Sequence, residues 1–173
     1  RLLSACVKIF GIYCQEKIII TAKKKLIPLP KQIDSDLAYF FGYLQGDGCL
    51  VKDGIRLTFT DEYIEQLENI NRLSEKIFGI RGTISFFSSE ISTKPCPRLH
   101  IKSVVMNSFF HVVLGLNRGK KKDMTIPTLI RHDKKLLSHY IAGLFDADGT
   151  IPKNPETAKQ LFLDITMRDQ SFI

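Results

Sequence analysis

Two stretches of the chain share one pattern of apolar, small and acidic positions. Residues 40–48 read FFGYLQGDG, and residues 141–149 read IAGLFDADG. Each is an apolar run with a small residue at its third and seventh positions, and each closes on Asp-Gly. Small residues four positions apart lie on one side of a helix, so the pattern predicts two helices whose backbones can approach each other closely. The residues that form these two narrow faces are Gly42, Gly46, Gly143 and Ala147.

The Asp-Gly ends place two acids at the same point of the pattern. Gly48 and Gly149 are expected to stop their helices, because glycine adopts the left-handed conformation after a helix without strain. Asp47 and Asp148 then lie at helix C-termini, where the helix dipole disfavours a carboxylate. If the small faces pack together, the two carboxylates lie side by side and need an offsetting cation, and such hard oxygen ligands suit Mg²⁺ or Ca²⁺. One Asp-Gly taken alone would indicate only a helix stop and a turn.

The hydrophobic periodicity around the first stretch predicts an alternation of helices and strands. The first expected element is a helix capped by Asp34 or Ser35 and running to about Gly46, followed by strands at 49–52 and 55–60 that turn at Asp53-Gly54. A helix at 62–78 follows, with core positions Ile64, Leu67, Ile70, Leu73 and Ile77. Strands at 82–87 and 98–102 and a helix at 104–114 complete the series. This order indicates a mixed α+β domain with helices on one face of a sheet.

Alternation along the strands predicts one buried and one polar sheet face. Ile55, Leu57 and Phe59 mark the apolar side of their strand. The opposite face collects cations, hydroxyls and an imidazole with no acid among them, which suits contacts to phosphates and base edges in a DNA groove. A merely solvated polar face is the alternative. The residues expected on this face are Arg56, Thr58, Thr60, Thr83, Ser85, Arg98, His100 and Lys102.

The segments on either side of this region extend the pattern. Before it we expect a helix at 1–12, a strand at 13–21 and a linker at Pro28 and Pro30. After it we expect a basic connector at 117–123, a second motif helix at about 134–147, and strands at 150–151 and 161–166. The second copy would then lack most of the elements of the first. The resulting divisions are an N-terminal extension and linker at 1–33, a first repeat at 34–122 and an incomplete second repeat at 123–173.

The second stretch resembles the LAGLIDADG motif of homing endonucleases at nearly every position. The first is a looser version, with Phe41 in place of a small residue, Tyr43 in place of leucine and Gln45 in place of the first aspartate. Both keep the acid at the eighth position. The resemblance covers about residues 34–173 and implies the two-motif type, a pseudo-symmetric monomer when complete. Its fold is built from αββαββα repeats, in which a saddle-shaped mixed or antiparallel sheet, with helices on one face, lies over duplex DNA.

The resemblance implies site-specific, metal-dependent hydrolysis of double-stranded DNA. In the family the eighth-position acids bind the divalent ion, so Asp47 and Asp148 are the expected catalytic ligands, and the carbonyls of Gly46 and Ala147 could assist them. Mg²⁺ is the expected cofactor, and Mn²⁺ or Ca²⁺ can substitute in binding.

The resemblance also assigns basic and polar residues near the end of the sheet. By motif position Arg168 would tune the water and the phosphate charge, whereas the matching position of the first repeat is acidic, Asp61 or Glu62. Further DNA contacts are expected in the second repeat, from Lys153, Asp164 and Thr166.

The composition of the chain indicates what kind of partner it binds and where in the cell it is found. The chain holds 25 Lys and Arg against 18 Asp and Glu, a net charge of +7 with a pI near 9.3, which favours a polyanion partner over a merely basic domain. No apolar run approaches the ~20 residues that cross a membrane, so we expect no membrane partner. The four cysteines form no CxxC pair, which favours reduced thiols in an intracellular protein and argues against zinc.

Two other functions fit the same residues. One is RNA binding without cleavage, since the motif helices also resemble those of intron maturases, and intron RNA would then be the partner. The other is a DNA-binding regulator that has lost catalysis. This function is favoured by the acidic position at Asp61 or Glu62 and by the incomplete second repeat. Asp47 and Asp148 are both present, which favours the nuclease. An origin as a mobile element in an intron or an intein, or as a free-standing gene, is left open by the sequence.

Overall fold

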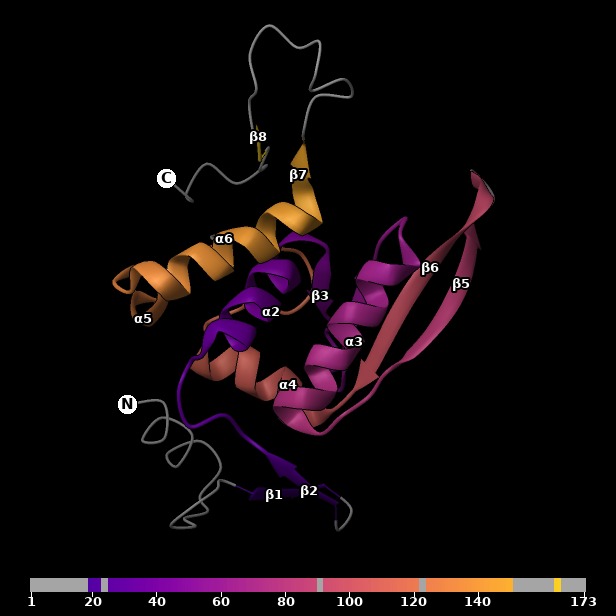
Figure 1. The fold of residues 1–173 in the computed structure, drawn as a ribbon. Coiled ribbons are helices and arrows are strands. Elements are labelled where there is room, and N and C mark those ends of the chain that lie inside the picture. Colours follow the sequence, from indigo (N-terminus) through magenta and orange to yellow (C-terminus); the bar gives the residue numbers. More distant parts are fainter. Residues whose placement is uncertain (1–18, 23–24, 90–91, 122–123, 151–163, 166–173) are drawn as a thin grey trace, which may run out of the picture.

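An antiparallel sheet of four strands forms the framework of the chain. The computed structural model describes residues 19–22, 25–89, 92–121, 124–150 and 164–165. The sheet contains β3 (Gly48–Leu50), β4 (Arg56–Thr60), β5 (Thr83–Ser89) and β6 (Ser92–Lys102), in the order β3-β4-β6-β5. Helices separate these strands in the chain, so the mixed α+β class is confirmed (Figure 1).

Helices cover the apolar face of this sheet. These are α2 (Ser35–Gly46), α3 (Ile64–Phe78), α4 (Val104–Ser108) and the π-helical turn η1 (Phe109–Val113). Alternate strand residues point at them and are fully buried, among them Phe59 and Leu99. Phe40 of α2 packs edge-on against Phe59, with ring centroids 5.6 Å apart. The two helices that the periodicity predicts at 34–46 and 62–78 are confirmed.

The ends of these helices follow their local sequence. Asp34 caps α2 by accepting a hydrogen bond of 2.9 Å from the Leu37 amide, and α3 ends at Gly79, whose φ is +63°. The third predicted helix, 104–114, differs from a single α-helix because its second half widens into η1. The wider turn allows two consecutive rings, Phe109 and Phe110, to be fully buried.

Two strand predictions are corrected. β6 begins at Ser92 rather than at 98 and contains Pro95 and Pro97. β6 pairs with β4 only over Arg98–Lys102, and before that range it pairs with β5 alone. The prolines lie in this earlier part, where β4 does not need a backbone N–H group from β6. Ile55, expected on the apolar side of β4, is 47% exposed, because it belongs to the turn before the strand.

A second small sheet precedes α2. β1 (Ile19–Ala22) pairs with β2 (Lys25–Pro28), and Ile27, Leu29 and Ile33 are buried in the core. Pro28, predicted to lie in a linker, is therefore the last residue of a strand. The predicted helix at 1–12 lies outside the described residues.

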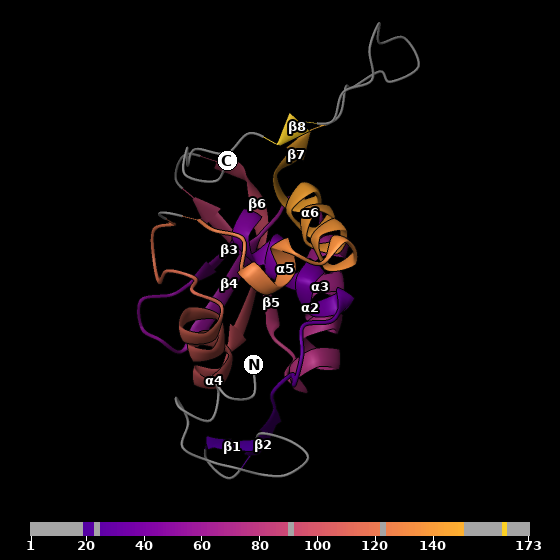
Figure 2. The same ribbon diagram turned by 90° about the vertical axis from the view of Figure 1, so that its left-hand side faces the viewer.

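The second motif forms a long helix beside the first. α5 (Thr128–Arg131) leads into α6 (Lys134–Asp148), which Asp133 caps and which packs on α2, so that α2 lies between α6 and α3 (Figure 1). β7 (Gly149–Thr150) then pairs antiparallel with β8 (Asp164–Ile165), as predicted for the parts of these strands that are described. Figure 2 shows α2, α3 and α6 together on one side of the strands.

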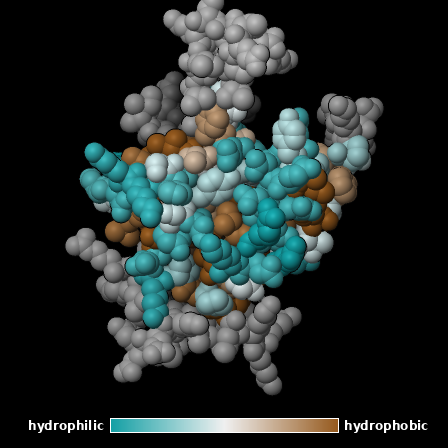
Figure 3. Space-filling view, viewed as in Figure 1, coloured by the Kyte–Doolittle hydropathy of each residue, from teal (hydrophilic) through white to brown (hydrophobic). Residues whose placement is uncertain are grey.

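The helical side seen in Figure 3 is mostly hydrophilic. Hydrophobic side chains that are exposed include Leu129 of α5 and Ile141 of α6. In the described part of the chain, no helix is long and apolar enough to cross a membrane.

Candidate metal and nucleic-acid site

The contact between α2 and α6, here called the seam, is made by the small residues of the two motifs. A Cβ atom added to Gly42 would lie well under 3.0 Å from the carbonyl oxygen of Tyr140, and one added to Gly143 would lie as close to the carbonyl of Tyr39. A Cβ on Gly46 would collide with the Cβ of Ala147. The predicted close approach of the two backbones is confirmed, and its contacts are reciprocal, since Gly42 meets Tyr140 as Gly143 meets Tyr39.

Hydrogen bonds repeat the same reciprocity. The Tyr39 hydroxyl of the first helix donates to the Asp146 carboxylate at 2.6 Å, and the Tyr140 hydroxyl of the second donates to the side-chain oxygen of Gln45. Gln45 is buried, and its amide nitrogen donates to the Thr125 carbonyl at 3.3 Å. An ionised aspartate at this position could not donate this second bond.

The glycines that end the two motifs act differently from the prediction. Neither Gly48 nor Gly149 has a positive φ: α2 ends on a right-handed Asp47, and Gly149 is extended. A Cβ on Gly48 would collide with Leu44, and one on Gly149 would collide with Phe145. Glycine is needed here because each strand starts immediately against the last turn of its own helix.

The seam brings the two motif acids to the same place. Gly46 immediately precedes Asp47 in the chain, and a Cβ added to Gly46 would lie 3.3 Å from a carboxylate oxygen of Asp148. Asp47 is half-buried and Asp148 is exposed. The pKa of Asp47 is raised from 3.8 to about 7, first by burial and then by the negative charges of Asp148 and Asp61, while Lys121 lowers it.

A cation of the chain itself also lies at this point. The ammonium of Lys121 donates a hydrogen bond to the carbonyl oxygen of Gly46. Lys121 as a whole residue is exposed, yet its ammonium lies at the end of α2, where burial lowers its pKa and the charges of Asp148 and Asp47 raise it. The sequence placed Lys121 only in a basic connector, and no local signal marks it as part of the site.

A third acid lies at the edge of this group. The Tyr43 hydroxyl donates to the Asp61 carboxylate, and the pKa of Tyr43 is raised by burial and then by this bond. Asp61 also contributes to the raised pKa of Asp47. The first repeat therefore presents a carboxylate near the site, as its sequence predicts.

The donors present suit a hard cation that is held only in part by the protein. Within the described ranges, no group of three or more His, Cys, Asp or Glu side chains is arranged to hold a metal. The donor set is two carboxylates, Asp47 and Asp148, with the carbonyl oxygen of Gly46 beside them. Mg²⁺ commonly binds through one or two carboxylates and completes its shell with water and substrate phosphate, so these residues fit it.

The polar face of the sheet has the composition that the alternation predicts. Its eight residues meet as cross-strand neighbours in the pairs Arg56–Lys102, Thr58–His100, Thr60–Arg98, Thr83–His100 and Ser85–Arg98. Phe87 extends this face and was not among the predicted residues, although it has the same alternation as Thr83 and Ser85. The Arg98 guanidinium lies 4.7 Å from the centre of the Phe87 ring and donates to Thr60 at 3.1 Å.

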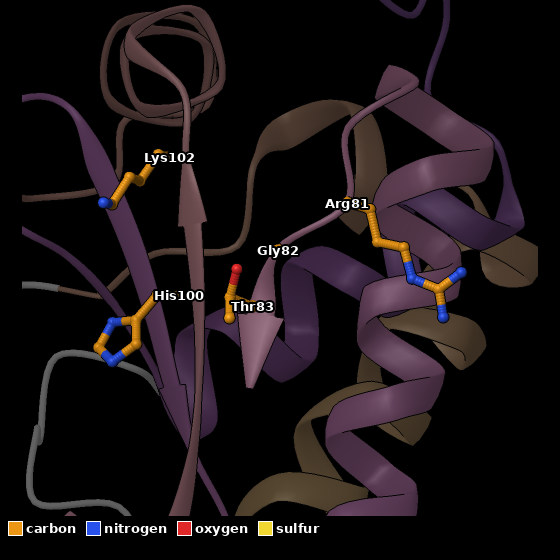
Figure 4. A pocket seen from close by; sticks show the side chains of 5 residues that line it. All are labelled: Arg81, Gly82, Thr83, His100 and Lys102. Atoms are coloured by element: carbon orange, nitrogen blue, oxygen red, sulfur yellow. The ribbon is translucent and has the colours of Figure 1, made fainter. Parts of the chain in front are cut away.

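A hollow of about 410 Å³ opens at one end of this face. Arg81, Gly82, Thr83, His100 and Lys102 line it. Figure 4 shows His100 and Lys102 on the same side of β6, whereas the Arg81 side chain extends toward α3, where it pairs with Glu75 at 3.4 Å. Burial and then the nearby cations, Arg98 first, lower the pKa of His100, so its imidazole is neutral at pH 7 and can donate and accept.

The remaining predicted site residues fall in the predicted second repeat, 123–173. Asp164 is exposed in β8, opposite Thr150. Arg168, Lys153 and Thr166 lie outside the described residues. Ala147 lies in the seam beside Gly46.

Comparisons with known proteins match a small part of much longer chains. No family model matches. The chain is 26% identical over 147 residues to the glutamine–fructose-6-phosphate aminotransferase (isomerizing) of Methanocaldococcus jannaschii, which covers 82% of this chain and 12% of that protein. It is 29% identical over 132 residues to the A subunit of the A-type ATP synthase of Pyrococcus abyssi, covering 75% of this chain and 12% of that one. The A subunit of the A-type ATP synthase of Pyrococcus horikoshii is 40% identical to this chain over 58 residues, and this match covers 34% of this chain and 6% of that protein.

Proposed function

We propose that this chain belongs to a LAGLIDADG-type endonuclease that hydrolyses phosphodiester bonds of double-stranded DNA with a divalent metal. The observation that carries the proposal is the meeting of Asp47 and Asp148 at the ends of two helices packed through small residues. Helix packing alone would not require an acid at both ends, because a carboxylate at a helix C-terminus opposes the helix dipole.

The sheet supplies the means to hold the substrate. Its polar face presents Arg56, Arg98 and Lys102 across three adjacent positions of two paired strands, with hydroxyl groups between them. Cations at this spacing would contact phosphates, while the threonines and the neutral His100 would reach base edges. β3 begins at the residue after Asp47, so a duplex held on this face would extend toward the acids.

The chain's own residues would perform distinct parts of the reaction. Asp47 and Asp148 would hold Mg²⁺, whose chemistry is to lower the pKa of a bound water and to stabilise the leaving oxygen. The seam fixes the position of both carboxylates, because its helices cannot separate without losing their backbone contacts. The basic residues of the face would keep the two scissile phosphates aligned with the acids.

The comparisons agree with a module that is separate from the activities named in its relatives. An aminotransferase and an ATP synthase component share no reaction, yet this chain resembles about 12% of each. A segment common to such different proteins is typical of an inserted element. This supports an origin inside a host protein, as in an intein, over a role in amino transfer or ATP synthesis.

Cleavage of a randomised duplex library tests the proposal. The chain is incubated with Mg²⁺ or with EDTA, beside Asp47→Asn and Asp148→Asn, and new ends are sequenced. We expect metal-dependent cuts at a limited set of sites, and a loss of at least about 10²-fold in each variant. Glu68→Gln, which removes one negative charge from the exposed side of α3, should cut normally. Cuts that survive in EDTA, or in both aspartate variants, would rule out the paired-acid site.

A nucleic-acid-binding protein without cleavage is the second function that an observation favours. Asp61 lies where a basic residue is expected, and Lys121 already bonds the Gly46 carbonyl. In that case the chain would bind duplex DNA or structured RNA with strong salt dependence and would leave both intact at every Mg²⁺ concentration. Preference for RNA over duplex DNA would indicate a maturase-like role, and the reverse preference a regulator.

A further inference from the structure

We propose that Lys121 is a built-in counter-ion of the acid site, and that a divalent ion binds by displacing its ammonium. The inference rests on the proposed function: without metal the site holds the ammonium of Lys121, and with metal it holds the divalent ion. One contact and one electrostatic effect define it: the ammonium of Lys121 bonds the Gly46 carbonyl, and the charges of Asp148 and Asp47 act on that ammonium without pairing with it directly.

The position of Lys121 follows from anchors just before it in the chain. The Gly119 amide donates to the Leu50 carbonyl at 2.7 Å, and Arg118 donates to the buried Asn107 side chain at 2.7 Å. The connector is therefore fixed alongside β3, two residues before Lys121. From there its flexible four-carbon stem reaches the end of α2, and the same stem can swing outward, because the residue as a whole is exposed.

The electrostatics of the seam require a positive charge at this point. Asp47 and Asp148 repel each other, and the helix dipole adds negative potential at the end of α2. The positive charge of Lys121 lowers the pKa of Asp47 and so favours its ionised form. Without metal the ammonium thus stabilises the packed helix ends.

A divalent ion and the ammonium exclude each other at this place. Both would bind the Gly46 carbonyl oxygen, and like charges within about 4 Å repel strongly in a partly buried site. Metal binding is therefore an exchange of one cation for another. The exchange weakens the apparent metal affinity of the two acids, and it releases an ammonium at the edge of the site, where a substrate phosphate can receive it.

Metal titration of charge-removal variants tests the exchange. Lys121→Met keeps the stem, and Lys121→Gln keeps a donor for the carbonyl; Lys120→Met, at the exposed neighbouring position, is the matched control. Binding of Mn²⁺ is measured by electron paramagnetic resonance, and thermal unfolding is followed with and without the ion. We expect both Lys121 variants to bind Mn²⁺ at least about tenfold more tightly than the native chain and the control. We also expect them to unfold at lower temperature without metal and to regain stability with it.

The native chain provides an independent readout through the reactivity of its amines. Acetylation by a water-soluble reagent, read by mass spectrometry at each lysine, should increase several-fold at Lys121 when Mn²⁺ is added, because displacement frees the amine. Lys120 should react equally in both conditions. In Asp148→Asn the metal should no longer change the reactivity of Lys121.

The outcomes separate this inference from the function on which it rests. Metal-dependent cleavage lost in Asp47→Asn, together with unchanged Mn²⁺ affinity in both Lys121 variants, would overturn the exchange and leave the nuclease standing. Absence of Mn²⁺ binding in the native chain and in all variants would overturn both, and Lys121 would then be a permanent structural cation. Tighter binding in the Lys121 variants without cleavage by any form would support the exchange and reject the nuclease.

Discussion

The pKa of Asp47 is raised to about 7, because burial and the charges of Asp148 and Asp61 disfavour its ionised form. In the unfolded chain the same group has a pKa of 3.8. Between these two values the folded protein binds a proton that the unfolded chain has released. The free energy of unfolding therefore falls as the pH rises from about 4 to about 7, and this contribution is constant above that window.

Replacing Asp47 by asparagine removes this penalty. At pH 8, without metal, we expect Asp47→Asn to be more stable than the native chain by roughly 1 to 2 kcal/mol, after allowance for solvent screening of a half-exposed group. Near pH 4 the two proteins should be equally stable. Urea denaturation at both pH values in EDTA measures the difference. The same stability difference at both pH values would contradict the assignment.

Single residues show how far sequence alone reaches. Asp47 and Asp148 could be found because each ends a recognisable pattern and the pattern occurs twice. Lys121 could not, because its place depends on anchors at Gly119 and Arg118 that form only in the folded chain. The partner of the buried Gln45 amide could not be found either, because Thr125 lies 80 positions away.

At the scale of elements, the seam depends on the absence of side chains at its crossing point. We expect Gly42→Ala to destabilise the chain by at least about 3 kcal/mol, since the added methyl group meets the backbone of α6, which cannot move without separating the helices. Urea denaturation followed by circular dichroism measures this. The same variant should weaken metal binding, because the two acids would no longer meet.

Gly115→Ala is the matched control for this substitution. Gly115 has a φ of +76° and no atom within 4 Å of an added Cβ, so alanine there meets backbone strain but no collision. We expect a loss of about 1 kcal/mol. Equal losses in the two variants would show that conformational strain, and not the close packing of α2 on α6, determines the effect at Gly42.

The elements themselves were predictable where their signals are local. The periodicity gave α2, α3 and α6, and the alternation gave the polar face of β4, β5 and β6. The start of β6 was missed because Pro95 and Pro97 normally exclude a strand, and only the pairing shows that they lie beyond the end of β4. The role of Gly48 and Gly149 was wrong because left-handed glycine and close-packed glycine have the same sequence signal.

The whole molecule separates its charges by location. Cations line one face of the sheet, and the acids lie at the seam where that sheet begins. Helices α2 and α3 cover the opposite face of the sheet (Figure 2). A net charge of +7 would attract DNA anywhere on the surface. Under the proposed function, the arrangement predicts instead that only the charges on the sheet face take part in specific DNA binding.

Two arginine substitutions distinguish these cases. Arg98→Ala should weaken binding to a cleavable duplex several-fold and reduce the slope of log Kobs against log[salt] by about 1. Arg72→Ala removes the same charge from the exposed surface of α3 and should leave the slope unchanged. Fluorescence anisotropy between about 50 and 300 mM salt measures both. Equal effects would indicate that DNA responds only to net charge.

The seam also has a consequence for the speed of folding. Its two reciprocal hydrogen bonds join residues 95 and 107 positions apart in the chain. Closing a loop of that length costs entropy before any contact compensates for it, so contacts between distant segments form slowly. The hairpin of β5 and β6 and the packing of α3 involve nearer segments and can form first. α2, although synthesised before the sheet it covers, receives its partner helix only after the chain has emerged as far as residue 148, and until then its glycine face is exposed to solvent.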